Sequence, residues 1–223
     1  MFKLQAPTKH AGQGYILVNQ GFGKNENDFY RQLGLKGHNG IDFNSTSRWD
    51  KGHAPVFAAH DGYVVSNSMI QSDTAGRFVK LLSDEVEIDG LPCKVMTLYF
   101  HLFSARVSDT DPLSAAWFDR SEMKDRFVRA GVLIGTSDNT GQYTTGPHIH
   151  FGMYILWKKP DGTFQANVSN GYNGAVDPMP YFKDDMVYQE PLGWFTPGDW
   201  WFNGKRITRK EADPLCKRIK AYS

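Results

Sequence analysis

The sequence predicts a mainly β protein with an antiparallel sheet at its core. Short runs of β-branched, aromatic and other apolar residues alternate with turn residues through most of the 223 residues. Runs of this kind, bounded by Gly, Asp or Pro, are typical of strands. Aromatic residues make up 14% of the chain, which suits a β-rich core or a groove that stacks sugars or peptides.

The predicted strands follow one another along the chain, with turn signals between them. In chain order they cover residues 55–59, 62–65, 78–82, 94–100, 132–134 and 148–156. The dipeptide Asp89-Gly90 follows a further short run at 86–88, and it is a strong signal for a β-hairpin turn. There is no internal repeat and no low-complexity linker.

One stretch inside the strand pattern departs from it. Residues 111–129 carry helix formers with apolar residues near helical spacing, which predicts a helical insertion between strands. We expect residues 1–182 to form one domain that contains this insertion, because the chain length is that of one ordinary domain.

The tail, residues 183–223, differs again in being rich in Trp, Gly and Pro. Thr208 and Glu211 form a capping box, which predicts a short C-terminal helix from about Arg209. From residue 203 onward the chain has seven Lys and Arg against two Asp and Glu, a local charge of +5. A solvated basic helix explains this charge better than a patch that binds a partner. We therefore treat the tail as an extension of unknown role.

Composition excludes several functional classes. The net charge is +1, so no global field favours nucleic acid or an anionic membrane. No run of about 18 apolar residues is present that would span a bilayer. The N-terminus lacks the apolar stretch of a secretory signal, so we expect either synthesis in the cytoplasm or a leader that has been removed. Cys93 and Cys216 show no metal-type spacing, and two reduced thiols are favoured over a disulfide.

Two short motifs bring together the residue types that a divalent metal requires. His38 and Asp42 are four residues apart, and glycines around them argue against a helix. In a strand, this even separation places both side chains on one face. His148 and His150 are likewise on one face of a strand, with Ile149 pointing into a core. Imidazole and carboxylate ligands suit zinc, which has three protein ligands and one water in catalytic sites, and spacing alone leaves open which of the pair bind it.

His101 lies at the end of the predicted strand 94–100. A histidine in such a place is, taken alone, more often a partly buried core residue than a catalytic one. The presence of the other histidine motifs strengthens the case that His101 is part of the site.

These motifs resemble those of the lysostaphin-type zinc endopeptidases, the M23 or LytM family, over about residues 14–182. Five separate motifs at sensible spacing make the resemblance specific. In the family's order they are Gly21-Phe22-Gly23 with Gly37-His38-Asn39-Gly40-Ile41-Asp42-Phe43, then residues 55–65, Leu98-Tyr99-Phe100-His101-Leu102, Ile134-Gly135 with Asn139-Thr140-Gly141, and Thr145-Gly146-Pro147-His148-Ile149-His150-Phe151 with a late Asp177-Pro178.

The resemblance implies roles that spacing leaves open. His38, Asp42 and His150 would be the ligands of Zn²⁺. His101 and His148 would flank the water without binding the metal, one as general base and the other steadying the oxyanion or the water. A neutral imidazole with a pKa near about 6.5 can accept a proton from zinc-bound water, whose pKa is near about 7.

Some relatives also use a tyrosine before the first ligand, and Tyr30 is the nearest candidate for oxyanion support. The chain departs from the family at several points that spare these site positions. The turn at 141–146 is one residue longer than usual, and Gly152 stands where an acidic residue is common. His60 replaces a small residue and is interpreted as structural, whereas His10 and His53 are interpreted as surface loop residues.

The implied fold is an antiparallel sheet with a groove over the metal. The implied activity is hydrolysis of peptide bonds in bacterial peptidoglycan, at a stem peptide or a cross-bridge, by a protein that we expect to be a monomer. The alternative is a non-catalytic module that binds the wall or regulates another hydrolase. The presence of all five site residues disfavours it. A purely structural zinc site is disfavoured because such sites normally have four protein ligands.

Action at the bacterial cell wall without a visible leader fits a phage lysin released at lysis, a lysin carried by the virion, or a chain whose leader is absent. The ligand set does not exclude divalent metals other than zinc.

Overall fold

The structure is a computed structural model. It describes residues 2–8, 16–25, 28–44, 53–68, 74–105, 125–183, 187–190, 198–202 and 205–222.

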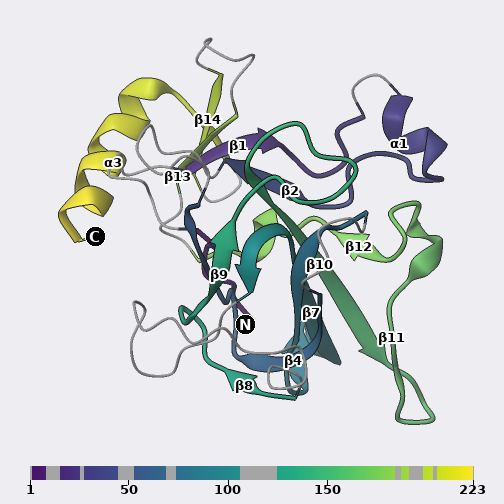
Figure 1. The fold of residues 1–223 in the computed structure, drawn as a ribbon. Coiled ribbons are helices and arrows are strands. Elements are labelled where there is room, and N and C mark those ends of the chain that lie inside the picture. The colour runs from purple at the N-terminus through teal and green to yellow at the C-terminus, as the bar shows by residue number, and fades with distance from the viewer. Residues whose placement is uncertain are drawn as a thin grey trace.

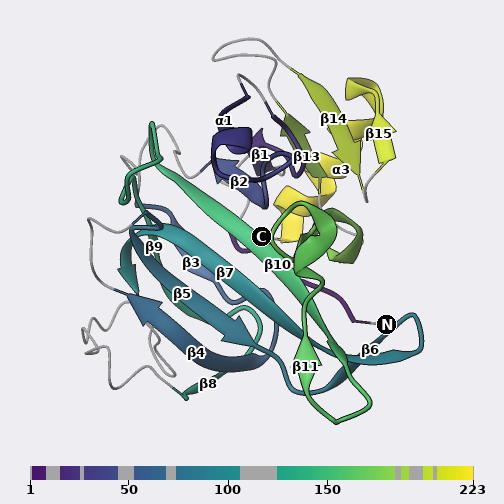
Figure 2. The same ribbon diagram turned by 90° about the vertical axis from the view of Figure 1, so that its right-hand side faces the viewer.

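The fold is organised around two long antiparallel strands, β7 (Leu91–Ala105) and β10 (His148–Lys158). They pair from Cys93 with Trp157 to Phe100 with His150, and they run side by side across the molecule in Figure 2. The main path of the sheet is β15-β14-β13-β1-β2-β10-β7-β5-β4-β8. The other strands on it are β1 (Ile16–Gln20), β2 (Ile41–Asn44), β4 (Gly62–Ser68), β5 (Arg77–Leu82), β8 (Phe127–Val128), β13 (Val187–Glu190), β14 (Asp199–Phe202) and β15 (Lys205–Ile207).

Shorter elements complete the sheet and connect its strands (Figure 1). They are α1 (Phe29–Gln32), β3 (Pro55–Phe57), β6 (Val86–Ile88), β9 (Leu133–Ser137), β11 (Phe164–Gln165), the 3₁₀ turns Val168–Asn170 and Met179–Tyr181, β12 (Ala175–Val176) and the C-terminal α3 (Arg209–Tyr222). The pairings are antiparallel except that of β1 with β13. The prediction of a mainly β protein with an antiparallel core is thus confirmed.

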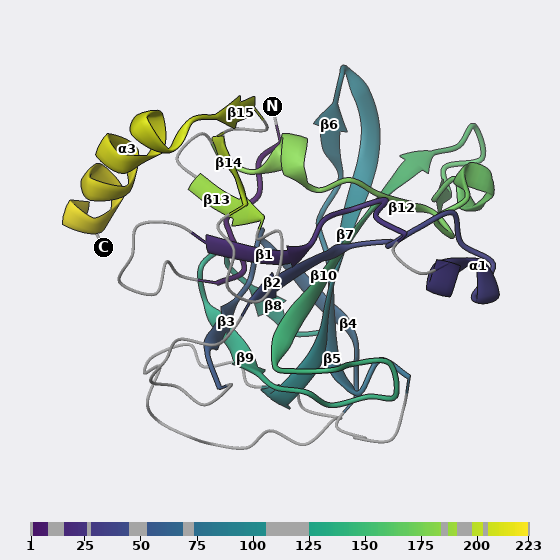
Figure 3. The same ribbon diagram turned by 90° about the horizontal axis from the view of Figure 1, so that it is seen from above.

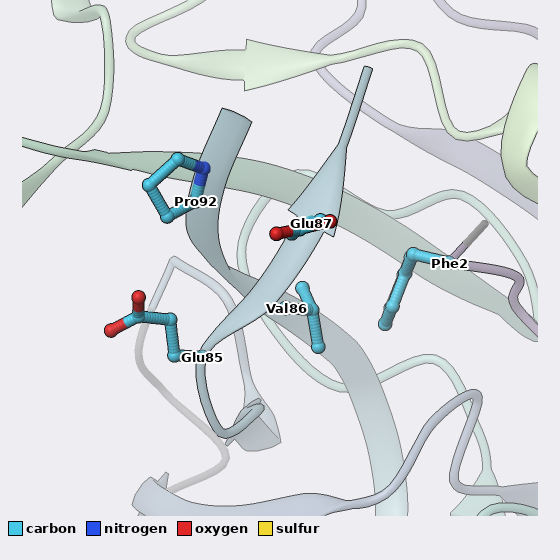
Figure 4. Close-up of a pocket in the computed structure, with 5 residues that line it drawn as sticks. All are labelled: Phe2, Glu85, Val86, Glu87 and Pro92. Carbon is cyan, nitrogen blue, oxygen red and sulfur yellow. The ribbon is translucent and has the colours of Figure 1, made fainter. Parts of the chain in front are cut away.

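The hairpin between β6 and β7 has the turn that the sequence predicts. Asp89 and Gly90 have φ angles of 52° and 77°. Positive φ at both central residues defines a type I′ turn, whose twist matches that of the flanking strands. A shallow hollow lies beside this hairpin, lined by Phe2, Glu85, Val86, Glu87 and Pro92 (Figure 4).

Most of the predicted helical insertion at 111–129, namely residues 111–124, lies outside the described residues. Its last part is wrong as a helix, because Phe127 and Val128 form β8 and pair with Tyr63 and Gly62 of β4. Val128 is buried, whereas Phe127 lies at the surface with its ring against that of Tyr63. Such alternation of buried and exposed residues is typical of a strand. Pairing with β4 therefore outweighs the local helical pattern.

The core lies on the face of the sheet opposite the predicted site residues of β10. Ile149 and Phe151 are fully buried in it, and Phe151 packs against Phe43 and Tyr99. The prediction that Ile149 points into the core is confirmed, and it places the neighbouring histidines on the other face.

The C-terminal extension continues the sheet. β13 pairs in parallel with β1, with Ile16 opposite Tyr188, and β14 and β15 follow as antiparallel strands. Figure 3 shows α3 at the periphery beyond these strands. The capping box is confirmed, because the Glu211 N–H donates to Thr208 Oγ1 and the Thr208 N–H donates to Glu211 Oε2.

Both cysteines are free thiols, and Cys93 is buried. Among the described residues, no helix has the length and apolar character needed to cross a membrane.

His60 belongs to a buried hydrogen-bond network with Thr97 and Tyr99. Its Nδ1–H donates to the Asp61 carbonyl at 2.7 Å, and its Nε2 is hydrogen-bonded to Thr97 Oγ1 at 2.9 Å. Thr97 Oγ1 in turn lies 3.1 Å from the Tyr99 hydroxyl, which also accepts the Ala59 N–H. Burial lowers the pKa of His60 below its usual value. These contacts agree with a structural role.

The lowered pKa of His60 predicts a pH-dependent stability. Below about pH 6.5 the unfolded chain takes up a proton at this residue that the folded protein does not, so the free energy of unfolding falls as the pH falls. We expect His60→Gln to reduce this loss by up to about 1.4 kcal/mol at about pH 5.5, which is about one pH unit below the pKa of the unfolded side chain. Denaturant unfolding of metal-free protein at about pH 7.5 and about pH 5.5 checks this.

The matched control is His53→Gln, which removes an exposed histidine and should leave the pH dependence as in the unmodified protein. Equal losses in the unmodified protein and His60→Gln would contradict the prediction.

Candidate functional site

The site begins with a cross-strand pair. β2 and β10 are antiparallel neighbours, and His150 lies directly opposite Asp42. Side chains opposite each other on adjacent strands point to the same face. His150 Nδ1 therefore lies 3.1 Å from Asp42 Oδ1. Two motifs more than a hundred residues apart in the chain meet through this register.

His38 joins this pair from a loop, not from a strand. The expectation that His38 and Asp42 share one strand is wrong, because β2 begins at Ile41. The loop is held instead by backbone bonds from the His38 N–H to Lys24 and from the Gly23 N–H to the His38 carbonyl. His38 Nε2 lies 2.9 Å from His150 Nδ1 and 3.2 Å from Asp42 Oδ1.

Two glycines make this approach possible. A Cβ on Gly37 would lie 2.4 Å from the Gly23 carbonyl oxygen, and one on Gly40 would lie 2.7 Å from His150 Cε1. Real side chains do not tolerate such distances, so any larger residue at either position must displace the loop or the His150 ring.

The three facing atoms fit a divalent cation. The His38 Nδ1–H donates to the Gly21 carbonyl at 3.1 Å, so in the neutral ring Nε2 presents a lone pair. Burial acts to raise the pKa of Asp42, but the facing imidazoles of His38 and His150 outweigh it and hold that pKa well below its usual value. His38 Nε2 and Asp42 Oδ1 thus both face His150 Nδ1 as acceptors, and one proton on His150 Nδ1 cannot satisfy both. Tetrahedral ligands about 2.0–2.1 Å from zinc would be about 3.3 Å apart, close to these separations.

Two further imidazoles lie beside this group. His148 Nε2 is 3.7 Å from Asp42 Oδ1, and the ring of His101 is 4.7 Å from that of His148. The His148 Nδ1–H donates to the Gly146 carbonyl at 2.7 Å, and the His101 Nδ1–H donates to the Thr140 carbonyl at 2.6 Å. One loop before β10 therefore orients both rings and leaves each Nε2 without a proton in the neutral form.

Burial also sets the charge of His101 and His150. It lowers the pKa of His101 to about 4, with His148 and His150 acting in the same direction. It lowers the pKa of His150 as well, although Asp42 opposes the shift. Both rings are therefore neutral near neutral pH. A neutral imidazole is the form that binds a metal or accepts a proton.

Tyr30 lies at the edge of the site. Its ring centroid is 5.4 Å from that of His38, and its hydroxyl donates to Gln20 Oε1 at 2.8 Å. A tyrosine of α1 is thus next to a predicted ligand, while its role in oxyanion support stays a prediction. The groove over the metal likewise stays a prediction.

Sequence reasoning missed the groups that orient the imidazoles. Three of them are backbone carbonyls, of Gly21, Thr140 and Gly146. It also missed Phe100, whose ring stacks on His150 at 5.4 Å and 17°. Carbonyl positions carry no residue-type signal, although all three residues lie in motifs that the resemblance had marked.

No protein-family model matches the chain, and no curated protein matches it in sequence. A comparison with solved structures does find matches. One is a Pseudomonas aeruginosa protein assigned to peptidase M23, with 16% identity over 79% of this chain and a TM-score of 0.41. This chain spans 52% of that protein's length, about half. Another is LytU, with 25% identity over 74% of this chain and 82% of that chain, and a TM-score of 0.45.

The first of these descriptions names the family that the motifs resemble.

The crowding at Gly40 predicts that metal binding depends on this residue. We expect Gly40→Ala to weaken Zn²⁺ binding by about tenfold or more, because the new methyl group displaces the His150 ring. Competition with a chromophoric chelator measures the affinity, and Asp42→Ala shows the effect of losing a ligand.

Gly146→Ala is the matched control, because a Cβ there meets no atom within 4 Å. Equal affinities for Gly40→Ala and the control would contradict the proposed geometry.

Proposed function

We propose that this protein is a zinc-dependent endopeptidase that hydrolyses peptide bonds in bacterial peptidoglycan and acts at the cell wall. The observation that carries the proposal is the group His38, Asp42 and His150, with the imidazoles of His101 and His148 beside it. Three protein ligands leave a coordination position open, as in catalytic zinc sites and unlike structural ones.

His38 Nε2, Asp42 Oδ1 and His150 Nδ1 would hold the ion. Bound there, Zn²⁺ would supply Lewis acidity toward a scissile carbonyl and would lower the pKa of a bound water.

The flanking histidines would move the proton. Each presents an unprotonated Nε2, because its Nδ1–H is engaged by a backbone carbonyl. Such a ring accepts a proton from a water at Nε2 and then donates it to the leaving amine. His148 is the closer of the two to Asp42, with 3.7 Å between Nε2 and Oδ1, and it is our candidate for the general base. His101 would then steady the oxyanion or the water.

The peptidoglycan substrate rests on the resemblance of the motifs to the lysostaphin-type family. The buried imidazoles agree with a narrow approach, since His148 and His150 are 9% and 8% exposed. Small residues at the scissile bond suit such a site. Peptides of the bacterial wall, in stem or cross-bridge, are rich in them.

The proposal predicts new peptide ends in digested walls. We expect the zinc-loaded protein to release fragments with new N-termini from peptidoglycan of at least one cross-link type. His148→Ala should lower the rate by about 10²–10⁴-fold, because it removes the group that accepts the proton. Mass spectrometry of the released fragments checks both outcomes and names the bond.

Metal content of the variant must equal that of the unmodified protein for the comparison to hold. If folded, zinc-loaded protein releases nothing from any wall type, the peptidase proposal fails. Wall binding without cleavage would then support the non-catalytic alternative.

A further inference from the structure

We propose that Thr140 is a positioning residue for His101, and that it acts by holding this histidine in an unusual backbone conformation. The inference rests on the proposed peptidase function, in which His101 is one of the two flanking imidazoles.

The backbone at His101 breaks the alternation of β7. Its φ is 62°, in the left-handed region that non-glycine residues seldom adopt. Successive residues of a regular strand point to opposite faces. Here Phe100 stacks on His150, and the next residue, His101, faces His148 on the same side. Leu102 is then fully buried in the hydrophobic core. The left-handed residue thus lets two consecutive side chains reach the site.

The strand also changes partners at this point. Phe100 is the last residue of β7 that pairs with β10, and Leu102 pairs with Ser137 of β9. A left-handed non-glycine residue costs about 1–3 kcal/mol unless its surroundings determine it. The contacts around His101 must therefore include groups that fix this conformation.

Thr140 supplies three such contacts, and its side chain is 2% exposed. Its hydroxyl donates to the Leu102 carbonyl at 2.9 Å and accepts the Arg77 N–H at 3.0 Å. Its carbonyl accepts the His101 Nδ1–H at 2.6 Å. One residue therefore binds the backbone directly after His101, the edge of β5, and the imidazole itself.

Two glycines show how closely this contact is built. A Cβ on Gly76, whose φ is +62°, would lie 2.4 Å from the Thr140 carbonyl and hydroxyl oxygens. A Cβ on Gly141 would lie 3.1 Å from His101 Nδ1. Glycine at these two positions thus leaves the space in which Thr140 contacts β5, β7 and His101.

The decisive variant is Thr140→Val, which keeps the shape of the side chain and removes both hydroxyl bonds. We expect kcat on a wall-derived peptide to fall by about 10–100-fold, because a small misplacement of a catalytic group has an effect of this size. KM should stay within about twofold, since Thr140 is buried and out of reach of a substrate at the surface. Thr140→Ser, which retains the hydroxyl, should restore kcat to within about threefold.

Thr97→Val is the matched control, because it makes the same exchange at a fully buried, hydrogen-bonded threonine on β7. Its kcat should equal that of the unmodified protein. An equal fall in kcat for both valine variants, or no rescue by Ser, would overturn the inference and leave only a general effect on stability.

A spectroscopic measurement separates this inference from the peptidase proposal. In ¹⁵N-edited NMR of the zinc-loaded protein, we expect His101 to carry a slowly exchanging proton on Nδ1, and Thr140→Val to shift that signal or speed its exchange. A proton on Nε2 in the unmodified protein overturns the inference even if Thr140→Val fails to fold. If the unmodified protein cleaves no wall, the peptidase proposal fails, and an unchanged His101 signal in Thr140→Val still overturns the positioning role.

Discussion

The register of β10 between β2 and β7 is the constraint on which the site depends. It places His150 opposite Asp42 on one side and opposite Phe100 on the other. A slip of one residue would turn His150 into the core and bring Ile149 to the site face. The buried residues on the core face of β10 disfavour that slip, because their apolar surface would become exposed. The apolar packing of one face thus fixes the geometry of the His38, Asp42 and His150 group on the other.

Much of this arrangement could be predicted from the sequence, because it follows from residue types and period-two alternation. The strands and the Asp89-Gly90 turn are of this kind. The grouping of His38 and Asp42 with His150 is instead implied by the resemblance of the motifs, since spacing leaves the ligand set open. What could not be predicted depends on long-range contacts. His38 reaches the site from a loop because Gly37 lies against Gly23, and no local pattern shows that contact.

The same limit explains the misassigned end of the helical insertion and the missed groups around the imidazoles. Phe127 and Val128 have a local pattern that also suits a helix, and only β4 makes them a strand. The carbonyls of Thr140 and Gly146 orient two histidines without any side-chain signal. The left-handed φ of His101 likewise depends on contacts with residues distant in sequence.

The pairing of β13 with β1 has a consequence for the edge that the sheet exposes. Without β13, part of β1 would be an outer strand with unpaired backbone groups, a template for aggregation between copies. With the extension in place, that edge of the sheet is instead β15, which has three residues, two of them Lys205 and Arg206. Short, cationic edges resist addition of further strands. The tail whose role the sequence left open therefore replaces an open edge at β1 with a short, cationic one at β15.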